Sequence, residues 1–110
     1  MIHMLSGFSL KDGETLEEFR AAYAAFIDDL LRADVIVDAG PLGRRVSDTP
    51  MDTDEDNPRE YFSVMSFRDR AHLDAAYAYI ENRTQPSTRT HIMMHRRITQ
   101  SVFTCWQDLD

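Results

Sequence analysis

The sequence predicts an α+β domain built on one antiparallel sheet, because short apolar segments rich in β-forming residues alternate with two amphipathic segments of helical period. The 110 residues suit a single domain, which we place over residues 1–110. Hydrophobic residues make up 43% of the chain and charged residues 28%, so the chain can bury a core and is not disordered.

The first strand and the first helix carry the clearest signals. Residues 2–10 are apolar and end at the turn sequence Lys11-Asp12-Gly13, which indicates a strand. A capping box formed by Thr15 and Glu18 starts a helix over residues 16–33. The apolar residues of this helix recur at steps of three and four: Leu16, Phe19, Tyr23, Phe26, Ile27 and Leu30.

The middle of the chain predicts two strands joined by an exposed loop. Residues 34–46 indicate a long strand that a bulge interrupts near Pro41, since proline has no amide hydrogen to donate to the ladder. Residues 48–58 hold five carboxylates, two prolines and no basic residue, which predicts a mobile loop. Residues 60–67 form the next strand, and both of its faces are largely apolar, so both must be covered.

The last third of the chain predicts a second helix and a final strand. Asp69 caps this helix, and we expect His72, in its first turn, at the surface. Its buried face should carry Leu73, Ala76, Tyr77 and Ile80. A short helical turn over residues 88–96 precedes a strand over residues 98–106.

These elements follow the order βαββαβ, which is the ferredoxin-like arrangement: a four-stranded antiparallel sheet with two helices on one face. The other face is bare, and Phe62 or Phe67, Val102 or Phe103, and Trp106 would make it a large apolar patch. Monomeric proteins rarely expose such a patch. We therefore expect two copies of the chain to pack sheet against sheet as a homodimer.

Charge and cysteine content exclude several classes of protein. The chain has 12 Lys and Arg against 19 Asp and Glu, a net charge of −7, which disfavours nucleic acid as a partner. No apolar run is long enough to span a membrane and no signal peptide is present, so we expect a cytoplasmic protein. The single cysteine, Cys105, excludes an internal disulfide, and we expect a buried, inert thiol.

Three segments carry a family resemblance: Ile2–Leu10 followed by Lys11-Asp12, Tyr61–Asp69 running into a helix, and Thr90–His95 before the final strand. Together with the element order they resemble the dimeric α+β barrel superfamily. The third segment is similar to the His-bearing stretch of stress-responsive barrel proteins and polyketide cyclases; other members are cofactor-free monooxygenases, lactone isomerases and proteins of unknown function. The resemblance implies the fold and a dimer, and it leaves the function open.

His91 and His95 are the candidate catalytic residues. They are four residues apart, so they share one face of a helical turn, and in the cyclase-like relatives this segment borders the ligand pocket. The spacing suits an acid–base pair, a metal pair or simple packing on a helix surface. The segment lacks the glutamate of a His-Glu-x-x-His motif and any other obvious ligand, so we expect no dedicated metal site.

Five further residues are candidate ligand contacts: His3, Tyr61, Tyr79, Arg97 and Trp106. The resemblance implies a pocket-facing histidine in the first strand, although His3 is offset by about one residue, and a one-residue slip turns a side chain to the opposite face. A tyrosine near an imidazole could orient a carbonyl or enol. Arg97 could bind a carboxylate or phosphate, or be ion-paired at the surface.

The sequence thus predicts a small dimeric protein that binds a small, partly apolar molecule between sheet and helices. One alternative is a cofactor-free enzyme, a cyclase, isomerase or monooxygenase, that uses a histidine base. The other is a non-catalytic dimeric interaction module. No phosphate-binding loop or nucleophile motif is present, and we expect no cofactor.

Overall fold

The computed structural model of the protein describes residues 1–82 and 86–110. In chain order the elements are β1 (Ile2–Leu10), α1 (Leu16–Arg32), β2 (Asp38–Ala39), β3 (Gly43–Arg44), β4 (Tyr61–Phe67), α2 (Arg70–Glu81), α3 (Pro86–His95) and β5 (Ile98–Gln107).

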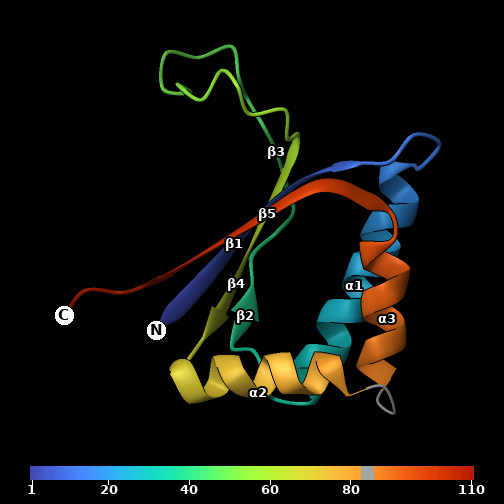
Figure 1. Cartoon of the computed structure of the whole chain (residues 1–110), viewed down its shortest axis with the longest axis vertical. Coiled ribbons are helices and arrows are strands. Elements are labelled where there is room, and N and C mark those ends of the chain that lie inside the picture. Colours follow the sequence, from blue (N-terminus) through green and yellow to red (C-terminus); the bar gives the residue numbers. More distant parts are fainter. Residues whose placement is uncertain (83–85) are drawn as a thin grey trace.

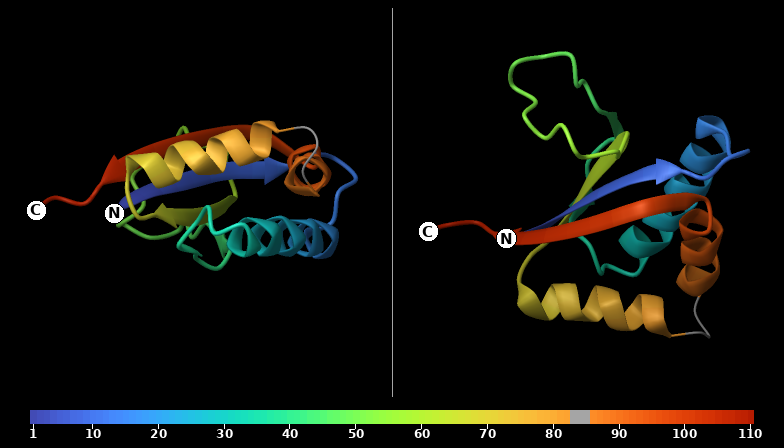
Figure 2. Two further views of the ribbon diagram at one scale, coloured as in Figure 1. Left: turned by 90° about the horizontal axis from the view of Figure 1, so that it is seen from below. Right: turned by 45° about the horizontal axis from the view of Figure 1, so that its top comes forward.

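One antiparallel sheet runs in the order β2-β4-β1-β5, with β3 pairing with β4 beside β2. The helices lie on one side of this sheet (Figure 1). Figure 2 shows α3 beside α1, with α2 running crosswise to both. The predicted α+β, ferredoxin-like class is confirmed, and the predicted helical turn before β5 is a ten-residue helix.

The strand predicted over residues 34–46 is two short strands separated by a bulge. Asp38 pairs with Ser66 and Arg44 pairs with Tyr61, so six residue steps on one strand face five on its partner. The extra residue lies around Pro41, which has no amide hydrogen for the ladder. The backbone amides of Val37, Gly40 and Arg45 still donate to β4 or to the residue before it.

The core lies between the sheet and the helices. Thr15 caps α1 as predicted and accepts a hydrogen bond of 3.2 Å from the amide of Glu18. The buried apolar side chains come from α1, α2 and α3, from the helix-facing sides of β1 and β4, and from the segments that follow α1 and α3: Phe8, Phe19, Tyr23, Phe26, Leu30, Val35, Ile36, Met65, Phe67, Ala76, Met94 and Ile98. The helices therefore bury only one face of the sheet.

His72 is a buried structural residue, so the surface position expected for it is wrong. Its side chain is 5% exposed and lies edge-on against Phe67. Nδ1 accepts a hydrogen bond of 3.1 Å from the amide of Arg68, and Nε2 lies 2.8 Å from the carbonyl oxygen of Asp34. The neutral imidazole with its proton on Nε2 satisfies both contacts. His72 thereby ties the start of α2 to the turn after α1.

The acidic loop between β3 and β4 extends away from the body (Figure 1) and closes around one arginine. Arg45 Nε and Nη2 donate hydrogen bonds of 2.8 and 2.7 Å to the two carboxylate oxygens of Asp52. The same guanidinium donates to the carbonyl oxygens of Asp54 and Asn57. This bidentate pair lowers the pKa of the Asp52 carboxyl through hydrogen bonding. The loop is exposed as predicted. It is also held by Arg45, which lies just before residues 48–58 in the sequence.

The other face of the sheet is bare and carries an apolar surface. The strand register places Leu5, Phe62, Val64, Val102 and Trp106 on this bare face, and Phe67 and Phe103 on the helix side. Gly7 leaves room for the Phe62 ring, which lies 3.2 Å from the position of a Cβ there. Cys105 is exposed, which corrects the expected burial of its thiol.

Candidate functional site

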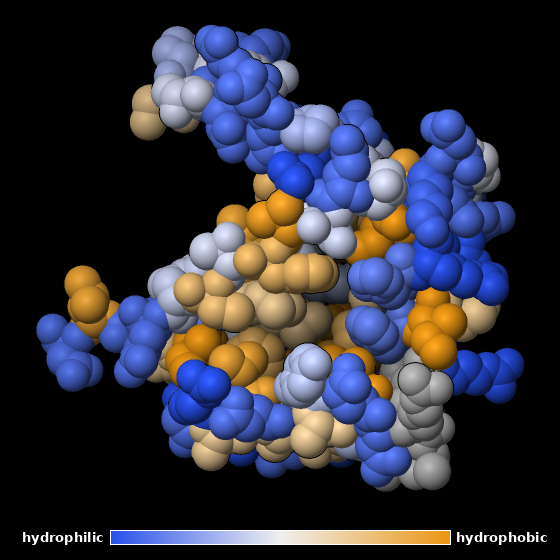
Figure 3. All heavy atoms as spheres, viewed as in Figure 1, coloured by the Kyte–Doolittle hydropathy of each residue, from blue (hydrophilic) through white to orange (hydrophobic). Residues whose placement is uncertain are grey.

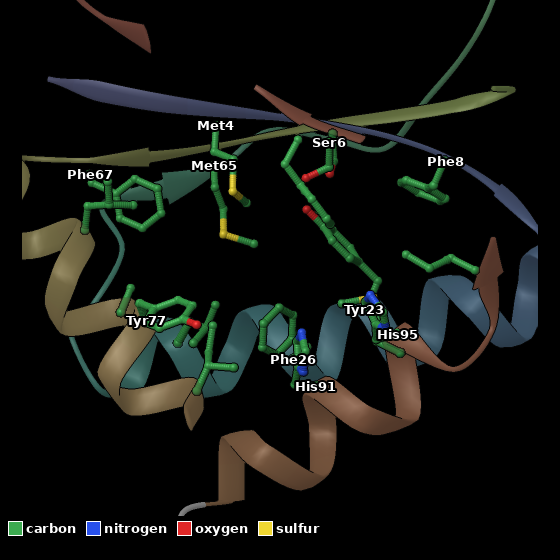
Figure 4. A pocket seen from close by; sticks show the side chains of 18 of the residues that line it. Met4, Ser6, Phe8, Tyr23, Phe26, Met65, Phe67, Tyr77, His91 and His95 are labelled. Atoms are coloured by element: carbon green, nitrogen blue, oxygen red, sulfur yellow. The ribbon is translucent and has the colours of Figure 1, made fainter. Parts of the chain in front are cut away.

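An apolar cavity of about 140 Å³ lies between the helix-facing side of the sheet and the three helices (Figure 4). Apolar atoms gather at a hollow in the surface between the sheet and α2 (Figure 3). Phe103 of β5 and Tyr77 of α2 both line the cavity and are also exposed. Tyr77 is 67% exposed, so its predicted place in the core is wrong, and it stands at the border of the cavity instead.

The alternation of the two central strands places the lining residues of the sheet. Met4, Ser6 and Phe8 alternate along β1, and Ser63, Met65 and Phe67 alternate along β4, all on the helix side. The helices add mostly apolar and aromatic side chains: Phe19, Tyr23, Phe26, Leu30, Leu73, Ala76, Tyr77, Ile80 and Met94.

Three hydroxyl groups provide the polar part of the cavity wall near the sheet. Ser6 and Ser63 are directly opposite each other on β1 and β4, and both are buried. Tyr23 reaches from α1 towards them (Figure 4). Its hydroxyl is buried and has no hydrogen-bond partner of acceptable geometry among the described residues. Burial raises the pKa of the Tyr23 phenol and the nearby Ser63 hydroxyl lowers it by less, so the phenol stays protonated at neutral pH.

His91 and His95 face the cavity from α3. Their rings stack on each other at a centroid distance of 5.3 Å, and His91 also lies 5.3 Å from the ring of Phe26. Burial lowers the pKa of the His91 imidazole, and the neighbouring His95 lowers it further, whereas Glu81 raises it. His91 is therefore neutral at pH 7 and able to accept a proton or a hydrogen bond.

Two of the predicted ligand contacts lie on the bare face and not at this cavity. His3 Nδ1 lies 2.8 Å from the Ser66 hydroxyl, and Nε2 lies 2.8 Å from an Asp108 carboxylate oxygen. Its ring is 5.2 Å from that of Trp106. The one-residue offset in the first strand thus does turn His3 to the face opposite the cavity.

The other three predicted contacts also lie outside the cavity lining. Tyr61 packs on Phe8 and lies under the guanidinium of Arg44. Tyr79 packs, partly buried, at the margin of the core. Arg97 forms ion pairs of 2.6 and 3.3 Å with Glu14 and Glu18, which join the start of β5 to the start of α1.

Sequence reasoning missed the three hydroxyls. Tyr23 continues the apolar stripe of its helix, so its pattern is that of a core residue. Ser6 and Ser63 did leave a signal, since each interrupts an apolar alternation that otherwise faces a core. Two polar residues at such positions on neighbouring strands indicate a polar spot in an apolar wall.

Metal and membrane features are not found in the described parts of the chain. No group of three or more His, Cys, Asp or Glu residues within residues 1–82 and 86–110 is arranged to hold a metal ion. In the same ranges, every helix is too short or too polar to cross a lipid bilayer.

Comparisons with known proteins give a family and a fold. The sequence model of a family of unknown function, DUF6614, matches residues 1–109. No curated protein matches the sequence. The fold is similar to that of an Arabidopsis thaliana protein, At3g17210, with a TM-score of 0.77 at 10% identity over 100% of this chain and 97% of that one.

Two further solved structures are similar. A variant of SnoaB, a cofactor-independent oxygenase from Streptomyces nogalater, has a TM-score of 0.69 at 15% identity over 99% of this chain and 93% of that one. A dimeric ferredoxin-like protein of unknown function from Jannaschia sp. has a TM-score of 0.69 at 15% identity over 97% of this chain and 98% of that one. At these identities the likeness extends to the fold alone.

Proposed function

Because the chain belongs to the DUF6614 family, whose function is unknown, we propose a function from the cavity itself: the protein binds a small, largely apolar molecule between its sheet and its helices. The observation that carries this proposal is an apolar cavity with a few polar groups in its wall. Binding sites for small molecules have this composition, in which apolar walls give affinity and a few polar groups fix the orientation.

The cavity volume limits the size of the molecule. Apolar cavities of about 150 Å³ bind benzene, whereas sites for drug-sized ligands span about 300–1,000 Å³. The 140 Å³ here therefore fits a compound with one ring. Tyr77, His95 and Phe103 line the cavity and are also exposed, so a short substituent on the ring could reach the surface beside them.

Filling the cavity should abolish this binding. Ala76 is buried on α2 and lines the cavity, so Ala76→Phe places a ring where the ligand would lie. We expect wild type to bind ethylbenzene in titration calorimetry and Ala76→Phe to bind it at least tenfold more weakly. The matched control is Ala75→Phe, one residue earlier on the exposed side of the same helix, which should bind as wild type does. Equal binding by wild type and Ala76→Phe would contradict the proposal.

A second candidate function is cofactor-free proton transfer with His91 as the base. The observation that favours it is a neutral imidazole against an apolar cavity whose far wall carries the Tyr23 hydroxyl. In that reaction the C–H proton next to a carbonyl moves to the imidazole, and the electron pair forms an enolate.

This second function predicts that the protein accelerates exchange of the methyl protons of acetophenone for deuterium, measured by NMR in D₂O. The rate should rise with pH through the His91 pKa, which lies below the ordinary 6.5, and then level off, because only the neutral ring accepts a proton. His91→Ala should lower the rate about 10²–10⁴-fold. Exchange that is unchanged by His91→Ala would exclude His91 as the base and leave binding as the function.

We also infer that two copies of the chain pack through the bare face. Val102 and Trp106 are exposed on that face, and Leu5, Phe62 and Val64 lie half-buried beside them in one apolar surface. A sheet face of this kind is normally covered. The dimeric ferredoxin-like protein from Jannaschia sp. supports the inference, since it has the same fold. Under this inference, His3 and Trp106 belong to a subunit interface and not to a ligand site.

A further inference from the structure

Among the described residues, the buried hydroxyl of Tyr23 finds no hydrogen-bond partner of acceptable geometry. The side chain is 9% exposed. Ser63 interacts with the hydroxyl and lowers the pKa of the phenol against the larger effect of burial, but the two hydroxyls do not form a hydrogen bond of acceptable geometry. Buried hydroxyls are nearly always hydrogen-bonded, since a hydroxyl loses its bonds to water on burial. A buried hydroxyl that lacks such a bond indicates that a bound molecule supplies the hydrogen-bond partner.

The surroundings hold this hydroxyl in one place. The Tyr23 ring stacks on Phe19 at a centroid distance of 5.9 Å, and α1 fixes its backbone. The side chain crosses from α1 towards the sheet, where its hydroxyl ends near Ser6 (Figure 4). Ser63, directly opposite Ser6, also lines the cavity. The oriented phenol therefore stands at the single polar spot of the sheet-side wall.

We propose that the Tyr23 hydroxyl donates a hydrogen bond to an uncharged acceptor oxygen on a bound one-ring compound. The class of ligand is therefore an aromatic or cyclic carbonyl compound. This inference rests on the proposed binding function and adds to it the chemical group that is recognised. Tyr23 acts here as a binding residue that selects among apolar molecules of similar shape.

Two properties of the wall decide the class. Burial keeps the Tyr23 phenol protonated, so it offers a donor to an acceptor oxygen. Among the described residues, the lining includes no Lys, Arg, Asp or Glu. It does include the imidazoles of His91 and His95, but burial lowers the pKa of His91, so the wall beside it disfavours a carboxylate or an ammonium group. An unpaired charge is strongly disfavoured in an apolar site. A neutral carbonyl oxygen satisfies the donor without introducing a charge.

The experiment compares ethylbenzene with acetophenone, which have the same carbon skeleton and differ by a carbonyl in place of a methylene. Titration calorimetry measures both affinities for wild type and Tyr23→Phe. We expect Tyr23→Phe to bind acetophenone about three- to tenfold more weakly, as for loss of one neutral hydrogen bond, and to bind ethylbenzene as wild type does. Tyr61→Phe is the control, because Tyr61 lies outside the cavity lining, and it should change neither affinity.

A second measurement needs no variant. The carbonyl stretching frequency of acetophenone bound to wild type should lie below its value in hexane, because hydrogen bonding weakens the C=O bond. An unshifted frequency, or an acetophenone affinity that Tyr23→Phe leaves unchanged, would overturn the role of Tyr23 while ethylbenzene binding still supports the cavity. Equal weakening of both probes would also overturn it, since that result reports altered packing. Failure of wild type to bind ethylbenzene at all would instead overturn the proposed function.

Discussion

Replacing Val102 with lysine should convert the protein from a dimer to a monomer at micromolar concentration. Val102 lies on the bare face beside Gly7 and is 43% exposed in the single chain. If two copies pack through this face, Val102→Lys buries an unpaired charge on both sides of the interface. Such a charge weakens association by about 2–5 kcal/mol, which is about 30-fold or more in the dissociation constant.

Light scattering checks this prediction directly. Wild type should have twice the 12.7 kDa mass of one chain, and Val102→Lys should have the mass of one chain with its circular dichroism spectrum unchanged. Val37→Lys is the matched control, because Val37 is 41% exposed but lies beside β2, at the opposite edge of the sheet. A monomeric wild type, or a Val37→Lys variant that dissociates equally, would remove the inferred interface.

Replacing His72 with alanine should lower the free energy of unfolding by about 3 kcal/mol. The change leaves the Arg68 amide and the Asp34 carbonyl oxygen without their partner at a half-buried position, and it opens a void where the buried imidazole packed against Phe67. A buried group left without its hydrogen bond costs about 1–3 kcal/mol, and the void adds to that loss.

Urea unfolding at one fixed protein concentration measures the effect, because association also contributes to apparent stability. The control is His95→Ala, which removes an exposed imidazole and should change the free energy of unfolding by less than about 0.5 kcal/mol. Equal destabilisation by the two variants would show that His72 does not join α2 to the turn after α1.

Local patterns predict the elements of the fold well, because each depends on residues close in the sequence. The apolar steps in α1 form the predicted helix and Thr15 caps it as predicted. Residues 61–67 form the predicted strand β4. Pro41 likewise marks a break that the pairing of β2 and β3 with β4 confirms. The order of these elements also predicts that the helices cover one face of the sheet and leave the other face bare.

Contacts between distant residues explain what the patterns miss. His72 meets the carbonyl oxygen of Asp34, 38 residues away, and no local pattern indicates that partner. Arg45 precedes the acidic loop in the sequence, and its guanidinium binds Asp52 within the loop. Tyr23 has the spacing of a core residue, and only the tertiary arrangement shows that its hydroxyl finds no well-aligned hydrogen-bond partner among the described residues. For His3, by contrast, the local pattern was sufficient: its offset of one residue in the first strand indicated that its side chain lies on the face opposite the cavity.

The claim that a ligand enters the cavity is tested most directly by NMR of ¹³C-methyl-labelled methionine. The cavity lining contains Met4, Met65 and Met94, whereas Met1, Met51 and Met93 are exposed and lie outside it. Titration with ethylbenzene should therefore shift three of the six methyl signals with one saturable binding curve, and leave the other three in place. If no signal shifts to saturation, or if the exposed methionines shift along with the others, ethylbenzene is not held in this cavity and the proposed binding function is wrong.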